Sequence, residues 1–296
     1  MSSAPRTRLT YMAERIVTTD GVQLCLETFG DREHPALLLV SGMSASMDWW
    51  DVDLCERLAA PGRYVIRYDH RDTGRSETSP VGEPSYTGDD LATDALRVLD
   101  SLGVARAHLA GISMGGGIAQ LLAARHPDRL LSITLISTTA AGTRTGTSKL
   151  PPPEPRVAAT FEAPAPEPAW GDRAAVVEYL VDAERLYAGA LGFDEDRMRA
   201  VARAVAGRSR DVAAAANHGA AGNSAFEFAL ADIRVPALVL HGTEDPLFPF
   251  AHGEALAAEI PGAKLVKLDG MGHQIPPPEL WDVVVPAIMQ HTAGAD

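Results

Sequence analysis

The stretch that most constrains the fold of this chain is His108–Gln120, which reads H-L-A-G-I-S-M-G-G-G-I-A-Q. An apolar run typical of a strand ends at Gly111, Ser113 follows, and Gly116–His126 has the apolar spacing of a helix. A strand, a G-x-S-x-G turn and a helix in this order form a nucleophile elbow, in which the turn is so sharp that the residues flanking the serine must be small. We therefore expect the hydroxyl of Ser113 to stand above the edge of a sheet.

Short apolar runs on both sides of this turn predict further strands, and helical patterns separate most of them. Wholly apolar runs are typical of strands that are buried on both faces of a parallel sheet. The predicted strands are a hairpin of Arg15–Thr18 and Val22–Phe29 around Asp20-Gly21, then Ala36–Val40, Tyr64–Tyr68, Leu131–Ile136, Ala237–His241 and Lys264–Leu268. The predicted helices between and after them are Trp49–Ala60, Asp89–Leu102, Phe250–Ile260 and Glu279–His291. The pattern predicts an α/β fold with a mostly parallel, eight-stranded sheet flanked by helices.

The alternation stops after the predicted strand that ends at Ile136. Thr138–Pro168 is rich in Thr, Gly, Pro and Ala, and three Ala-rich helical patterns follow at Ala174–Ala190, Asp194–Ala206 and Asp211–Phe228. We expect a disordered extension over residues 1–13, a core over 14–136 and 230–296, and a helical cap over 137–229. The cap should lie over the carboxyl ends of the strands, where open α/β sheets bind ligands.

Composition excludes several partners. Lys+Arg number 26 against 39 Asp+Glu, a net charge of −13, which argues against nucleic acid and anionic membranes. The two cysteines, Cys25 and Cys55, form no CxxC pair, as expected in a reducing compartment. No apolar run reaches the ~18 residues of a membrane span, and no apolar stretch follows the basic N-terminus as in a secretory signal. We therefore expect a cytoplasmic protein without a membrane partner.

A serine hydroxyl needs an adjacent base to become a nucleophile. Of the nine histidines, His273 is the best candidate, because it closes a Gly-rich segment, Asp269–His273, directly after the last predicted strand. His70, in the polar loop Asp69–Ser76, is the weaker rival. The histidines at 108 and 241 lie inside predicted strands and are expected in the core.

The imidazole in turn needs a carboxylate, and His241–Pro246 offers two after a predicted strand. We favour Asp245, whose shorter side chain ahead of a proline can fix one tautomer with less loss of entropy. Glu244 is the alternative. Ser137–Thr145, another place for such an acid, contains no carboxylate. The order Ser…Asp…His differs from those of chymotrypsin and subtilisin.

Backbone N–H groups complete the predicted site. An oxyanion hole would use the N–H of Met114, directly after the serine, and that of Met43 in the loop after Ala36–Val40. There is no HExxH, no CxxC and no phosphate-cradling glycine motif, so we expect neither a metal nor a cofactor.

On these residues the chain resembles an α/β-hydrolase with a helical cap. The resemblance rests on three segments in family order: Gly111–Gly116, His241–Asp245 and Gly272-His273. It implies the α/β-hydrolase fold and a serine hydrolase. Within the family, R-D-T-G-R-S at 71–76 and G-I-S-M-G-G at 111–116 are similar to the aclacinomycin methylesterase group of polyketide-tailoring esterases, and to esterases that open macrolide lactones.

Two positions depart from the family pattern. Ser41-Gly42 stands where His-Gly is usual, so hydrogen bonding near Met43 should differ. Asp72 stands where glycine is usual in the loop Asp69–Ser76. The arginines of that loop, at 71 and 75, are expected to pair with buried acceptors.

Aromatic residues indicate the kind of substrate. The candidates for a mostly apolar pocket are Trp49, Trp50, Phe161, Trp170, Tyr179 and Tyr187, each of which could instead belong to the core. Such a pocket suits a bulky hydrophobic ester or lactone, such as a polyketide- or macrolide-like methyl ester. Two alternatives stay open: cofactor-free haloperoxidase, perhydrolase or C–C hydrolase chemistry with the same three residues, and a non-catalytic protein that binds a small molecule.

Overall fold

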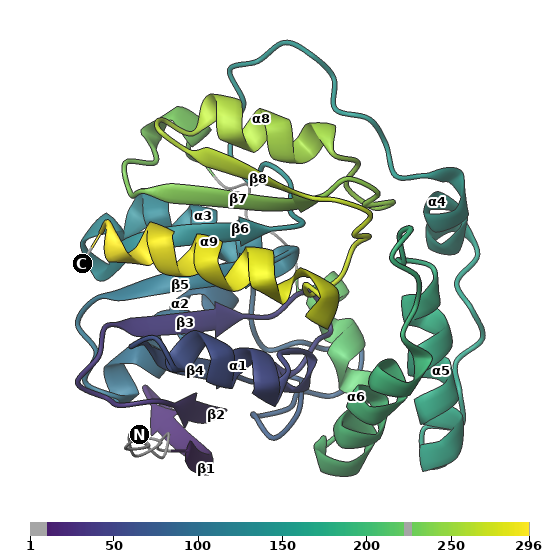
Figure 1. Cartoon of the computed structure of the whole chain (residues 1–296). Coiled ribbons are helices and arrows are strands. Elements are labelled where there is room, and N and C mark those ends of the chain that lie inside the picture. Colours follow the sequence, from purple (N-terminus) through teal and green to yellow (C-terminus); the bar gives the residue numbers. More distant parts are fainter. Residues whose placement is uncertain (1–10, 222–226, 296) are drawn as a thin grey trace, which may run out of the picture.

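The computed structural model describes residues 11–221 and 227–295, which form one sheet with helices around it (Figure 1). The strands are β1 (Tyr11–Thr19), β2 (Val22–Phe29), β3 (Ala36–Val40), β4 (Tyr64–Tyr68), β5 (Ala107–Ile112), β6 (Leu130–Ile136), β7 (Ala237–Gly242) and β8 (Lys264–Leu268). The α-helices are α1 (Val52–Ala59), α2 (Gly88–Ser101), α3 (Met114–Arg125), α4 (Pro155–Glu162), α5 (Arg173–Arg185), α6 (Glu195–Arg208), α7 (Asn217–Ala220), α8 (Ala251–Glu259) and α9 (Trp281–Ala293). Short 3₁₀ turns are η1 (Met47–Trp49), η2 (Pro127–Arg129), η3 (Ala213–Ala216), η4 (Leu230–Asp232) and η5 (Pro278–Leu280).

The eight strands lie in the order β1-β2-β4-β3-β5-β6-β7-β8. The β1–β2 and β2–β4 pairs are antiparallel, and every later pair in the order is parallel. The prediction of a mostly parallel, eight-stranded sheet is therefore confirmed. Because β3 and β5 are parallel neighbours at the centre, the loops that follow them open at the same edge.

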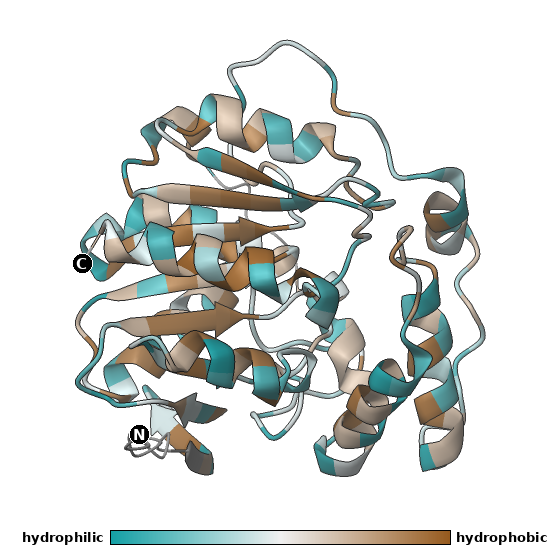
Figure 2. Cartoon of the chain, in the orientation of Figure 1, coloured by the Kyte–Doolittle hydropathy of each residue, from teal (hydrophilic) through white to brown (hydrophobic). Residues whose placement is uncertain are grey.

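Helices bury both faces of the sheet. One apolar core joins the sheet to α2, α3 and α8, and a second joins it to α1 and α9. The strand β3 is buried at every residue, as its A-L-L-L-V sequence predicts. Figure 2 shows this arrangement as brown strands in the interior, with mixed teal and brown on the surrounding helices.

Helices α4 to α7 lie between β6 and β7; we call residues 137–229 the cap segment, of which 222–226 lie outside the described ranges. Figure 1 shows α4, α5 and α6 beyond the arrowheads of the parallel strands. Helices α5 and α6 pack through Val177, Val181 and Ala202, and Arg199 of α6 pairs with Glu178 of α5. The cap segment thus has a small apolar core of its own.

Three sequence expectations need correction or fall outside the described residues. Helix α4 lies in the Pro-rich stretch Thr138–Pro168, for which the sequence pattern predicts no helix; it begins at Pro155, where a missing N–H costs nothing. In the described part of the helix expected over Asp211–Phe228, residues 211–221, the chain instead forms η3 followed by the single turn α7. The expected disordered extension falls mostly on residues 1–10, outside the described ranges, and β1 begins at Tyr11. Across the described residues, no helix has the length and apolar content to cross a membrane.

Candidate active site

Ser113 occupies a strained turn between β5 and α3. Its φ is +53°, in the left-handed region that non-glycine residues rarely adopt. A methyl group at Gly111 would collide with the carbonyl of Gly115, and one at Gly115 would collide with the carbonyl of Val40. Two hydrogen bonds hold the turn: Ser113 N–H donates to the Ile136 carbonyl (3.0 Å), and Thr138 Oγ1 donates to the Ser113 carbonyl (2.8 Å). The small neighbours predicted for this turn are therefore sterically required.

Two predicted oxyanion-hole donors flank this serine. Met114 is the first residue of α3, so its N–H has no acceptor within the helix and lies at the positive end of the helix dipole. The loop after β3 approaches from the other side, and a Cβ built on Gly42 would lie 3.5 Å from that of Ser113. Met43 follows in this loop, exposes 54% of its surface and lines the same cavity as the serine.

Asp245 and His273 come together from the loops after β7 and β8. Nδ1 of the imidazole lies 2.9 Å from Oδ2 of the carboxylate, and the backbone N–H groups of Leu247 (2.9 Å) and Phe248 (2.8 Å) donate to Oδ1. Since an ionised carboxylate only accepts, Nδ1 carries the proton and Nε2 has a free lone pair. Burial by itself raises the pKa of Asp245, but His273 and the Phe248 N–H outweigh it and hold that pKa below its usual value.

Glu244 and His70, the alternative candidates for the acid and the base, do not form such a pair. Glu244 is exposed, whereas Asp245 is buried. His70 is fully buried under the loop after β3, with Nε2 3.1 Å from the carbonyl of Ser41, and burial lowers its pKa to about 3. His241 is also buried, with Nε2 2.7 Å from the Phe248 carbonyl.

A cavity of about 440 Å³ opens between the cap segment and the sheet edge, and both Ser113 and His273 line it. Of the predicted aromatic residues, Trp49, Tyr179 and Tyr187 are in its wall. Other wall residues include Ile112, Leu180, Ala183, Glu184, Leu191, Phe193, Met198, Val201 and Ile275, together with the charged residues Asp194, Arg197 and Glu279. The wall is thus mainly apolar, with a few polar groups that can orient a ligand.

Three aromatic residues expected in this wall lie elsewhere. Trp50 is 1% exposed and belongs to the core formed with α1 and α9. Phe161 is 62% exposed on the short helix α4. Trp170 lines a second, smaller cavity and stacks edge-on against Tyr179, at 5.6 Å between ring centroids.

The cap segment contacts the His273 loop directly. The N–H of His273 donates to the carbonyl of Tyr187 (2.8 Å), and Leu191 N–H donates to the carbonyl of Gly270 (3.1 Å). A Cβ on Gly272 would overlap the Tyr187 carbonyl, so this contact requires glycine. The segment after α5 therefore sets the position of the imidazole.

The cap segment also braces the predicted oxyanion loop. Ser44 N–H donates to Nδ1 of His218 (2.9 Å), a residue of α7, and Ser44 Oγ donates to the Ala215 carbonyl (2.8 Å). Nε2 of His218 therefore carries the proton and donates to the Arg71 carbonyl (2.8 Å). Burial lowers the pKa of His218, which favours this neutral form. Ser41, at the family's histidine position, donates to the Ser46 carbonyl (3.2 Å).

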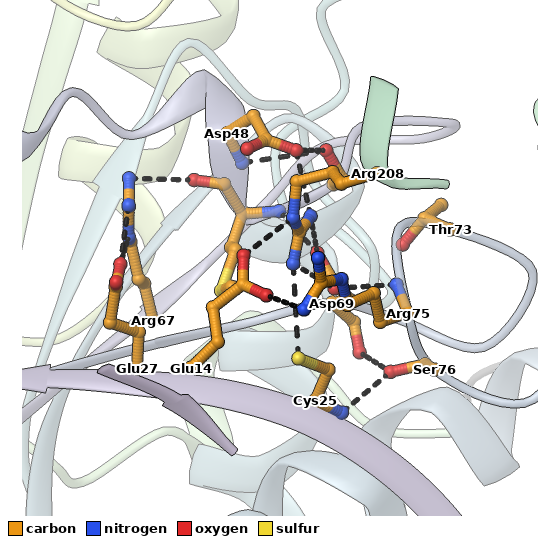
Figure 3. Close-up of polar contacts among 12 residues, drawn as sticks. Glu14, Cys25, Glu27, Asp48, Arg67, Asp69, Thr73, Arg75, Ser76 and Arg208 are labelled. Atoms are coloured by element: carbon orange, nitrogen blue, oxygen red, sulfur yellow. Dashed lines mark hydrogen bonds and ion pairs between the residues drawn. The ribbon is translucent and has the colours of Figure 1, made fainter. Parts of the chain in front are cut away.

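Beneath this loop lies a buried ion-pair cluster that the sequence did not indicate (Figure 3). Arg208, the last residue of α6, donates to Asp69 (2.8 and 3.0 Å), Asp48 (2.8 Å) and Glu14 (2.6 Å). Asp69 also accepts the N–H groups of Met47 (3.0 Å) and Arg75 (2.9 Å). One arginine of the cap segment thus joins β1, η1 and the loop after β4.

The predictions for the loop Asp69–Ser76, which follows β4, are partly confirmed. Arg71 pairs with the buried Asp94 through two hydrogen bonds, of 2.7 and 2.8 Å, as expected. Arg75 instead pairs with the partly exposed Glu14, and its own side chain is 51% exposed. Asp72, where the family has glycine, has a φ of +63°, and its carboxylate accepts hydrogen bonds from Tyr86 (2.7 Å) and Asn217 (2.9 Å) that hold this conformation.

Neither cysteine nor any described acidic or histidine cluster suggests a metal centre. Both cysteines are free and buried, and burial raises the pKa of each thiol to about 12. Within residues 11–221 and 227–295, no group of three or more His, Cys, Asp and Glu residues could hold a metal ion.

A family profile, a curated relative and a solved structure each match most of the chain. Residues 35–277 match the profile described as "alpha/beta hydrolase fold". The chain is 35% identical to the rhodomycin D methylesterase DauP of Streptomyces sp. (strain C5), over 96% of this chain and 99% of that protein. Among solved structures, the enol-lactonase of Burkholderia xenovorans LB400 is 28% identical, with a TM-score of 0.70, and the match covers 94% of this chain and 100% of that one.

Proposed function

The chain belongs to the alpha/beta hydrolase fold family and is an ester hydrolase, and from that premise we propose that Ser113, His273 and Asp245 are its catalytic triad. The observation that carries this proposal is the joint position of the strained serine and the Asp245-bound imidazole at one cavity. In this proposal the substrate is a bulky hydrophobic ester.

The reaction follows from the groups at this cavity. Oγ of Ser113 attacks the ester carbonyl while Nε2 of His273 takes the hydroxyl proton. The N–H groups of Met43 and Met114 hold the oxyanion, and the tetrahedral intermediate then expels the alcohol, which receives the proton from the imidazolium. Water, deprotonated by Nε2, attacks the acyl-serine, and the second tetrahedral intermediate releases the carboxylic acid as Oγ of Ser113 takes the proton back from the imidazolium. Asp245 stabilises the imidazolium in both halves of the reaction.

The wall of the cavity supports the choice of substrate. Trp49, Tyr179 and Tyr187 provide aromatic surface for a flat ring system, and aliphatic residues such as Leu180, Val201 and Ile275 add to the apolar wall. The similarity to a rhodomycin D methylesterase over nearly the whole chain favours the methyl ester of a polycyclic compound over a lactone. A methyl ester has a small leaving group, so the bulk of such a substrate would lie on the acyl side.

A panel of esters tests this assignment. The measurement is kcat/KM for three kinds of substrate: the methyl ester rhodomycin D, a separate macrolide lactone, and short and long p-nitrophenyl esters. Methanol release is the readout for the methyl ester. We expect the polycyclic methyl ester to have the highest kcat/KM, and Ser113→Ala to lose about 10⁴-fold or more in rate on every ester. Preference for the lactone, or hydrolysis of the short p-nitrophenyl esters alone, would refute the proposed substrate.

A further inference from the structure

One face of α5 forms the wall of the cavity opposite the strand ends. The residues that form it are Tyr179, Leu180, Ala183 and Glu184 of α5 and Tyr187 just beyond its end, with the three- and four-residue spacing of a single helical face. The N–H of Tyr187 donates to the carbonyl of Glu184 (3.0 Å), which continues the turn past the end of the helix. Four of the five side chains are aromatic or aliphatic. The fifth is a carboxylic acid.

No contact of the Glu184 side chain within the described residues explains why a carboxyl group lies in this wall. It is partly buried and lines the cavity, and no hydrogen-bond or ion-pair partner contacts its carboxylate within the described residues. Burial raises its pKa to about 7, and the nearby His273 lowers it only in part. An unpaired carboxyl in an apolar wall is costly, since burial penalises its charged form. A ligand that carries the opposite charge would remove that cost.

The other charged groups of the wall are already compensated or exposed, and Glu279 is one of the exposed groups. The guanidinium of Arg197 is paired with both carboxylate oxygens of Asp51, and Asp194 accepts the Arg197 N–H at the start of α6 (3.0 Å). His273 is paired with Asp245. Glu184 is therefore the partly buried wall carboxyl that still has unused hydrogen-bonding capacity, among the residues the structure describes.

From this arrangement we propose that the cavity contains a cation subsite, in which Glu184 pairs with a protonated or quaternary amine of the substrate between the rings of Tyr179 and Tyr187. The subsite rests on the proposed function and narrows it to bulky hydrophobic esters that carry a basic nitrogen. A carboxylate supplies the charge, and aromatic faces attract a cation through their quadrupoles. The cation binds in the same cavity as Ser113, so it lies on the ester that is being hydrolysed.

A pair of matched esters tests the subsite. The two p-nitrophenyl esters have acyl chains of equal length that end in a trimethylammonium group or in the isosteric tert-butyl group, and several chain lengths are compared. The measurement is the ratio of their kcat/KM values at about pH 8, one unit above the pKa of Glu184. Wild type, Glu184→Gln and Asp182→Asn are compared. Asp182 is an exposed carboxylate of the same helix, outside the cavity wall, so its variant controls for the loss of one negative charge.

We expect wild type to favour the ammonium ester at the chain length that reaches the subsite. Glu184→Gln should lower the ratio about tenfold, equivalent to about 1.4 kcal/mol, and Asp182→Asn should leave it unchanged. Equal ratios in wild type and Glu184→Gln, with both esters hydrolysed, would overturn the subsite and leave the proposed function intact. Equal changes in both variants would also overturn it, because they would assign the preference to long-range charge. If wild type hydrolyses neither ester and its serine takes no fluorophosphonate, the proposed function fails and the subsite fails with it.

Discussion

Replacing Arg208 with glutamine tests whether one buried arginine joins the cap segment to the sheet. The Arg208 side chain is 9% exposed, and those of its partners Asp69 and Asp48 are 0% and 10% exposed. Glutamine keeps much of the aliphatic stem but removes the charge and most of the donors. The variant would therefore leave the Asp69 carboxylate buried without its cation (Figure 3).

The magnitude follows from what remains around Asp69. Breaking a buried ion pair by removing one partner costs about 3–5 kcal/mol. Two backbone N–H donors, those of Met47 and Arg75, still contact the carboxylate, which favours the lower end, about 3 kcal/mol. For a chain of this size that loss corresponds to a decrease in Tm of about 5 °C.

The loss should depend on pH. Burial raises the pKa of Asp69 above its ordinary value even with Arg208 present, and the pKa rises further without it. From about pH 4 upward the unfolded chain releases the Asp69 proton while the folded variant keeps it, so the variant loses stability as pH rises towards the raised pKa. The destabilisation should therefore be larger at about pH 8 than at about pH 5.

Thermal and denaturant unfolding at both pH values measure this effect. Arg203→Gln is the matched control, because Arg203 is an exposed arginine of the same helix. Adding Asp69→Asn to Arg208→Gln should recover part of the stability, since the orphaned charge is removed. An Arg208→Gln variant no less stable than Arg203→Gln, or equally destabilised at both pH values, would refute the reasoning.

Three further predictions concern activity. Asp245→Asn should lower kcat about 10⁴-fold while Glu244→Gln changes it little, because only the former residue contacts the imidazole; similar kcat values for the two variants would contradict the assignment. Gly272→Ala should lower kcat about 100-fold by displacing the loop that carries His273, whereas Gly171→Ala, with open space around it, should not; matching kinetics would contradict the steric argument. His218→Leu should lower kcat/KM about threefold to tenfold, because the predicted oxyanion loop loses an acceptor; a change in Tm alone would assign His218 a purely structural role.

The sequence predicted the sheet because its signals are local. A fully buried strand such as Ala36–Val40 is apolar throughout, and the turn at Ser113 needs glycines that can be read from a few adjacent residues. The choice of Asp245 over Glu244 rested on side-chain length and on the following proline. The former is buried against His273 and the latter is exposed. Their roles in catalysis stay predictions.

What the sequence could not predict depends on contacts between distant residues. Arg208 and Asp69 are 139 positions apart, and nothing near either residue distinguishes this pair from other charged residues. Trp50 and Phe161 are aromatic residues in the expected regions, but tertiary packing puts the first in the core and the second on the surface. Glu184 is likewise an ordinary glutamate of an amphipathic helix until the face that it shares with Tyr179 is known to line the cavity.

The most direct test of the central claim is reaction with a fluorophosphonate, measured by intact mass and followed by peptide mapping. We expect one adduct on the wild-type protein, located on Ser113, none on Ser113→Ala and little on His273→Ala, since only an activated serine reacts rapidly. A folded wild-type protein that takes no adduct, or takes it on another residue, would contradict the assignment of Ser113 as the nucleophile.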